Sequence, residues 1–145
     1  MKPTSAACFI TVAIATVVSI APLGCAGSNT VVQTMTTSAR TPAGAATIRT
    51  SSTSNGNTAL FLQVRNLAPP SRVAEDATIY MVWLQPPNGT IQGVGALTLD
   101  RDLSGTLNTE TPYRAFKVIV TPEPNSQVEQ PTHEPVLSSE VDRRP

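Results

Sequence analysis

Histidine, cysteine and aromatic residues are scarce in this chain of 145 residues, which has one His, two Cys, one Trp, two Tyr and three Phe. Zinc sites of the usual kind need several Cys or His ligands, and the one histidine, His133, lies in a Pro-rich segment. A Ser-His-acid set would have to recruit this same residue, and the sequence has no Gly-x-Ser-x-Gly motif. We therefore expect no catalytic residues, no metal and no cofactor, and we predict that the protein is not an enzyme.

An excess of charge of either sign is also absent, because ten Lys and Arg residues balance ten Asp and Glu residues. The basic residues are scattered along the chain and form no cluster. Such a distribution creates no field that would attract nucleic acid or an anionic membrane surface. We expect no nucleic-acid partner.

The first 24 residues read MKPTSAACFITVAIATVVSIAPLG. They contain one Lys, then a mostly apolar run from Ala6 to Ala21, and then small residues. This layout is typical of a secretory signal peptide. The alternative, a transmembrane anchor, needs roughly 20 apolar residues, and Pro22 interrupts the run. We predict a signal peptide over residues 1–24.

The stretch APLGCAG, residues 21–27, spans the end of this segment and resembles the bacterial lipobox. On that resemblance Gly24 precedes the cleavage point, and Cys25 carries the lipid and becomes the new N-terminus. Pro22 stands where the pattern usually has Leu, and ordinary cleavage after Ala26 is the alternative. Because Cys8 lies inside the signal, the mature chain would keep only Cys25 and could form no internal disulfide. We expect a protein anchored by this lipid to a membrane of the bacterial cell envelope, on its extracytoplasmic side.

Residues 25–42 are rich in Ser, Thr, Ala and Gly. Such a composition buries too little apolar surface to offset the entropy of ordering. We predict a flexible tether over 25–42, with an edge strand at Val31 and Val32 as the alternative. The remaining residues, 43–145, have the length of a single domain.

Apolar residues recur at every second position from residue 45 onward. Leu60, Leu62 and Val64 alternate with other residues in one run, and Phe116 begins the same pattern in another. A period of two predicts strands, and the runs that contain them are 45–52, 58–66, 78–85, 91–99, 105–110, 115–121 and 135–141. Seven strands without a helix predict an all-β, immunoglobulin-like antiparallel sandwich, in which Trp83 matches the buried Trp of the third strand.

Two Asn-Gly pairs separate neighbouring strands of this prediction. They are Asn55-Gly56 and Asn88-Gly89. Asn and Gly both tolerate the positive φ angles of a type I′ turn, whose twist matches that of the flanking strands. We predict a type I′ hairpin at each pair.

The third run, TIYMVWL, is apolar in both phases. Its two faces carry Tyr80, Val82 and Leu84 and, opposite, Ile79, Met81 and Trp83. A sandwich strand normally buries one face only, so the second face needs a cover. The cover is either the tether or Pro-rich segment of this chain, or an envelope protein. In the second case Tyr80, Val82 and Leu84 are the candidate partner-binding residues.

The stretch DRDLSG repeats the first half of a calcium-binding loop, with oxygens at Asp100, Asp102 and Ser104. The bidentate Glu of such a loop is replaced by Thr111. A tight turn explains the same residues, because Asp and Ser side chains accept hydrogen bonds from turn amides and Gly105 supplies a positive φ. We predict a turn and no metal site.

The order of motifs resembles the extracytoplasmic C-terminal domain of the anti-sigma-K factor family. The segments that carry the resemblance are YMVWLQPPNGTIQGVGALTLDRDLSGTL and YRAFKVIVTPEPNSQVEQPTHEPVL, within residues 45–141. It implies a sensor-like or partner-binding β module. In that family a cytoplasmic helical segment binds the sigma factor and a transmembrane helix follows it, whereas here the predicted signal peptide precedes the domain. We therefore expect a binding module without a sigma-binding segment of its own, or, as the alternative, a structural envelope lipoprotein with no specific ligand.

Overall fold

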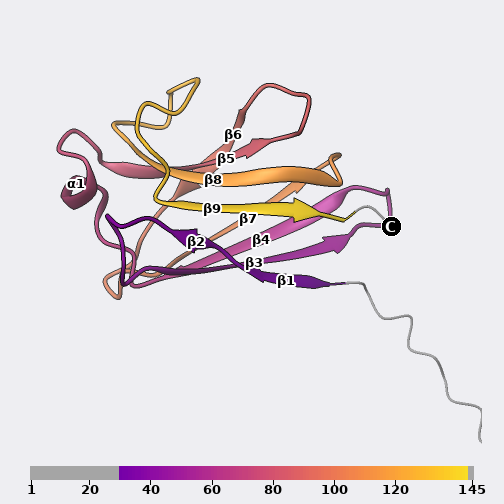
Figure 1. Ribbon diagram of the computed structural model, residues 1–145, viewed down its shortest axis with the longest axis horizontal. Coiled ribbons are helices and arrows are strands. Elements are labelled where there is room, and N and C mark those ends of the chain that lie inside the picture. The colour runs from indigo at the N-terminus through magenta and orange to yellow at the C-terminus, as the bar shows by residue number, and fades with distance from the viewer. Residues whose placement is uncertain (1–29, 144–145) are drawn as a thin grey trace, which may run out of the picture.

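The computed structural model describes residues 30–143 as a two-layer sandwich of antiparallel strands (Figure 1). One sheet has four strands, in the order β1 (Val31–Thr34), β3 (Ala45–Ser52), β4 (Thr58–Arg65) and β7 (Gly105–Thr111). The other has five, in the order β2 (Thr36–Thr37), β9 (Leu137–Asp142), β8 (Ala115–Glu123), β5 (Ile79–Gln85) and β6 (Gln92–Leu97). The predicted class, an antiparallel all-β sandwich, is confirmed, with nine strands between residues 30 and 143 in place of seven.

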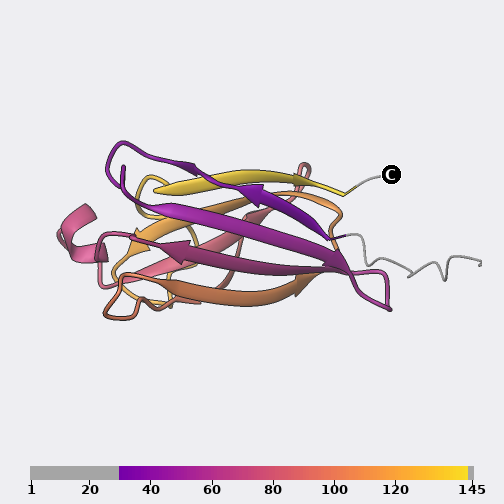
Figure 2. The same cartoon turned by 90° about the horizontal axis from the view of Figure 1, so that it is seen from below.

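The chain passes repeatedly between the two sheets. β3 and β4 form a hairpin in the four-stranded sheet, and β5 and β6 form one in the five-stranded sheet. β7 then returns to pair with β4, and β8 lies between β5 and β9 (Figures 1 and 2). The one helix of the described residues, α1 (Pro70–Val73), is a single turn ahead of β5, and no helix in this part of the chain is long and apolar enough to cross a membrane.

The core lies between the sheets and follows the predicted alternation. Leu62 and Val64 of β4 have no exposed surface, and Leu60 is 2% exposed. On β8, Phe116 is 3% exposed, whereas the next residue, Lys117, lies on the outer face. These side chains belong to one cluster that both sheets contribute to. The sheet phase predicted from the sequence is therefore confirmed for β4 and β8.

The predicted tether over residues 25–42 is wrong for residues 31–37, which form β1 and β2. β1 pairs with β3 in one sheet, and β2 pairs with β9 in the other. Met35, between them, is 3% exposed in the core, and its N–H donates to the Ala46 carbonyl at 2.9 Å. One buried apolar side chain and backbone pairing at both sheet edges are enough to order a polar segment, because strand pairing satisfies the amides whatever the side chains are.

The two Asn-Gly pairs lie in hairpin loops, but the predicted type I′ turns are wrong. A type I′ turn needs positive φ at both central residues. In the β3–β4 loop only Gly56 has it, at 85°, and its N–H donates to the Thr53 carbonyl at 3.1 Å. In the β5–β6 loop neither Asn88 nor Gly89 has positive φ, and the Gly89 N–H donates to the Pro86 carbonyl at 3.2 Å. Both loops are longer than two residues, so ordinary turns suffice.

Candidate functional site

The strand predicted to offer a partner contact, β5, is part of the sandwich core. Tyr80 and Val82 have no exposed surface and Leu84 is 2% exposed. All three belong to the cluster between the sheets, and the Tyr80 hydroxyl donates to the Ala68 carbonyl at 2.7 Å. The partner-binding assignment of Tyr80, Val82 and Leu84 is therefore wrong, because the four-stranded sheet covers this face of β5.

The burial of Tyr80 has a measurable effect at high pH. It raises the pKa of the phenol from 10.0 to about 12, because the charged form is poorly solvated inside the protein. As the pH rises above 10, Tyr80 ionises in the unfolded chain before it ionises in the folded protein. The contribution of neutral Tyr80 to the free energy of unfolding is therefore present below pH 10 and disappears by about pH 12. At neutral pH we expect Tyr80→Phe to lower the free energy of unfolding by about 1 kcal/mol, because it removes the hydrogen bond to the Ala68 carbonyl.

Urea unfolding of both proteins between pH 8 and 12 tests this effect. The wild type should lose up to about 2 kcal/mol more than Tyr80→Phe over that range. Other groups that ionise at high pH are shared by the two proteins and cancel in the difference. Parallel stability curves for the two proteins would contradict the assignment.

The opposite face of β5 is covered by this chain, which was one of the two alternatives for it. Met81, Trp83 and Ile119 form a second apolar cluster on the outer side of the five-stranded sheet. Val128, from the Pro-rich segment after β8, and Ile91, from the β5–β6 loop, pack against the cluster. Trp83 is fully buried there, and not between the sheets as in an immunoglobulin-like sandwich.

A hydrogen-bonded network around one buried carboxylate holds this cover in place. Glu123, the last residue of β8, has no exposed surface. Its Oε1 accepts the hydroxyl of Thr121 at 2.5 Å and the Thr132 N–H at 3.0 Å, and its Oε2 accepts the Thr132 hydroxyl. The Trp83 indole N–H donates to Thr121 Oγ1 at 2.8 Å. The network therefore ties residues 124–136 to both β5 and β8.

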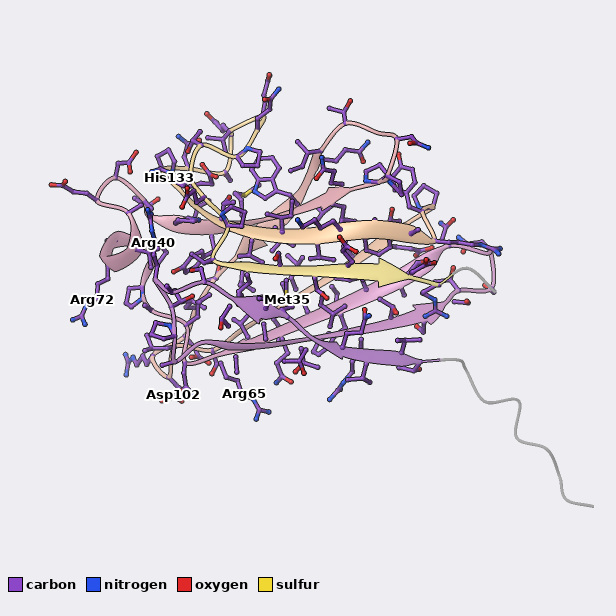
Figure 3. All side chains as sticks on the ribbon, in the orientation of Figure 1. Met35, Arg40, Arg65, Arg72, Asp102 and His133 are labelled. Carbon is purple, nitrogen blue, oxygen red and sulfur yellow. The ribbon has the colours of Figure 1, made fainter. Side chains whose placement is uncertain are left out.

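His133 extends the network to the surface. Its Nδ1 lies 2.9 Å from Thr132 Oγ1 and its Nε2 lies 3.0 Å from Oδ1 of the exposed Asp76, which precedes β5. Thr132 gives its hydroxyl proton to Glu123, so His133 is not placed to activate that hydroxyl as a nucleophile. These contacts position the Pro-rich segment that carries His133, the residue labelled in Figure 3. Among residues 30–143, no group of three or more His, Cys, Asp and Glu side chains could hold a metal ion.

The DRDLSG stretch forms a turn between β6 and β7. Oδ1 of Asp100 accepts the N–H groups of Asp102 and Ser104, each at 2.9 Å, so this carboxylate oxygen is used inside the turn. The residue with positive φ is Leu103, at 57°, and not Gly105 as predicted. Gly105 is needed for a different reason, because a Cβ there would lie 2.6 Å from the Thr98 carbonyl oxygen.

The outer face of the four-stranded sheet carries mostly polar and basic side chains. Strand register places its side chains in rows across the sheet. One row contains Val32, Arg49, Phe61 and Asn108, and the next contains Thr34, Thr47, Gln63 and Thr106. We call this surface the polar face.

Arg49 and Arg65 border a hollow on the polar face. The hollow has a volume of about 310 Å³, and its lining residues are Ala45, Thr47, Arg49, Gln63 and Arg65. The Arg49 guanidinium lies over the Phe61 ring, 5.8 Å from its centre, within the range of a cation–π contact. Arg65 is exposed and points away from the core (Figure 3). Two guanidinium groups, an amide and a hydroxyl therefore surround one space that has no carboxylate in its lining.

Neither arginine is neutralised by a neighbour. Within residues 30–143 no carboxylate forms an ion pair with Arg49 or Arg65. A second hollow, of about 510 Å³, continues from Arg49 toward Asn108 and Glu110. Hydrogen bonds from Asn57, and also from Asn55 and Thr53, hold the pKa of Glu110 below its ordinary value. The polar face thus has a cationic end and one ionised carboxylate at the other end.

No sequence pattern indicates the polar face. Arg49 and Arg65 lie on different strands, and only the β3–β4 register brings them to one hollow. Cys25, the predicted lipid attachment residue, lies outside the residues that the structure describes. No protein-family model and no curated protein matches the chain.

Proposed function

We propose that the protein is a lipid-anchored, extracytoplasmic binding module of the bacterial envelope whose contact surface is the polar face. The observation that carries this proposal is the pair of guanidinium groups, Arg49 and Arg65, exposed around a hollow without a carboxylate partner. On the outer side of the five-stranded sheet, by contrast, Val128 and Ile91 of this chain cover the apolar cluster. Unpaired cations on an open face are suited to recognising an anionic ligand.

A structural envelope lipoprotein without a specific ligand is the second candidate. The complete burial of Tyr80 and Val82 favours it, because an apolar strand left open for a protein partner would have argued for binding. The two candidates differ in what substitutions on the polar face should do. They should weaken binding to another molecule if the protein is a binding module, and should change no binding if it is a structural lipoprotein.

The resemblance to the outer domain of anti-sigma-K factors remains part of the proposal. It is supported by the order of the sequence motifs, which fall on β5 to β9 of a sandwich. On this basis we propose that the module makes its contacts outside the cytoplasmic membrane and does not itself bind a sigma factor.

Anchoring through Cys25 is tested in bacterial cells that express the full chain. We expect metabolic labelling with a fatty acid to mark the wild type, and Cys25→Ser to abolish the label and release the protein from the membrane fraction, because no other lipid attachment is predicted. Cys8→Ser serves as the matched control and should leave both unchanged. A labelled Cys25→Ser protein, or an unlabelled wild type that stays in the membrane fraction, would contradict the lipid anchor.

A further inference from the structure

We propose that the polar face binds an acidic polysaccharide, with the hollow between Arg49 and Arg65 receiving its carboxylate groups. This inference rests on the proposed function, since it names the ligand of the same surface. The ligand class follows from three features of the described residues: the charges at the hollow, the composition of the face around it, and the length of that face.

The charges at the hollow select an anion. Guanidinium groups bind carboxylates through paired N–H donors, and both Arg49 and Arg65 line the hollow. Gln63 and Thr47, between the two arginines, add an amide and a hydroxyl. Glu110, in the second hollow of the same face, places a negative charge at its far end. The carboxylates of the ligand are therefore expected to bind at the end that carries Arg49 and Arg65.

The composition of the face selects a sugar chain over a protein. Protein interfaces usually centre on buried aromatic or aliphatic anchors. Here Phe61 is partly buried and lies beside Arg49, and the exposed aliphatic side chain, Val32, lies on the edge strand β1. Hydroxyl and amide side chains occupy most of the remaining positions, among them Thr47, Gln63 and Asn108. Such groups form hydrogen bonds with the hydroxyls that a polysaccharide presents at every unit.

The length of the face suits a polymer. The two hollows share Arg49 and lie end to end along β3 and β4. From Ala59 to Arg65 the outer face of β4 extends roughly 20 Å at about 3.4 Å per residue. Several consecutive sugar units can therefore contact the face at once, while only those near Arg49 and Arg65 need a carboxylate.

The test measures binding of fluorescent hexagalacturonate to the purified protein by anisotropy at low ionic strength. We expect saturable binding that the double variant Arg49→Gln with Arg65→Gln weakens at least tenfold. Arg72→Gln, on the exposed surface of α1, is the matched control and should bind as the wild type does. Because Arg49 and Arg65 are exposed, both variants should keep the β-type circular dichroism spectrum and the unfolding temperature of the wild type.

Three further probes define the ligand. The neutral galactohexaose should bind at least tenfold more weakly than hexagalacturonate, and equal binding would overturn the role of charge. Acetate or inorganic phosphate that competes at the concentration of the oligosaccharide would show a simple anion site and overturn the polysaccharide. A hexaglutamate peptide that binds as tightly as hexagalacturonate would overturn it in favour of a protein partner.

Failure of the ligand class and failure of the proposed function give different results. A photo-crosslinking residue in place of Asn108, on the polar face, is introduced into the protein in intact cells. If hexagalacturonate does not bind but this residue forms an adduct that requires Arg49 and Arg65, the polysaccharide is excluded and the binding module stands. If neither binding nor an adduct is found, both proposals are wrong and the structural lipoprotein is the better conclusion.

Discussion

Replacement of Phe116 by alanine is expected to lower the free energy of unfolding by about 3–5 kcal/mol, the range typical of a large aromatic side chain removed from a packed core. Phe116 lies on β8 with 3% of its surface exposed and contributes to the cluster between the sheets. The substitution leaves a cavity that the two sheets cannot close without moving strands. Urea unfolding followed by circular dichroism measures the loss.

Lys117→Ala provides the matched control, since it changes the neighbouring residue on the outer face of the same strand. Its effect should stay within about 0.5 kcal/mol, as for most surface substitutions. Similar losses at the two positions would mean that the phase of β8 is incorrect.

The strands could be predicted from the sequence because burial of one face imposes a period of two. β3 begins and ends at the predicted residues, and β4 ends one residue earlier than predicted. The period also identified Leu62 and Phe116 as core residues. At β5 this signal fails, because both faces are apolar and both are buried. The sequence alone then does not say which face meets the other sheet.

Features that depend on contacts between distant segments were not predictable in this way. Met35 orders β1 and β2 by entering the core, although its neighbours have the composition of a tether. Nothing in the sequence distinguishes Glu123 from the other acidic residues, and its burial depends on Thr132 in a later segment. Arg49 and Arg65 likewise border one hollow only because of strand register.

Glu123→Ala is expected to detach the Pro-rich segment from the five-stranded sheet. The substitution removes the acceptor of the buried Thr121 hydroxyl and of the hydroxyl and N–H of Thr132, which lies at the surface. A polar group left without a partner in a buried position costs about 1–3 kcal/mol, so we expect a loss of about 1–3 kcal/mol in the free energy of unfolding. Because Val128 of the detached segment covers Trp83, that indole should become exposed to water in the folded protein.

The single Trp of the chain makes this outcome distinguishable from a general loss of stability. In Glu123→Ala, the fluorescence emission of Trp83 should shift to longer wavelength, and acrylamide should quench it, before urea unfolds the protein. In Phe116→Ala the cover stays intact, so the emission should remain that of the wild type until the protein unfolds. Glu129→Ala removes an exposed carboxylate from the same segment and should change neither stability nor emission. If Glu123→Ala loses stability but its folded form shields Trp83 as the wild type does, Val128 and Ile91 hold the cover by apolar packing alone, and the carboxylate serves only to satisfy its own neighbours.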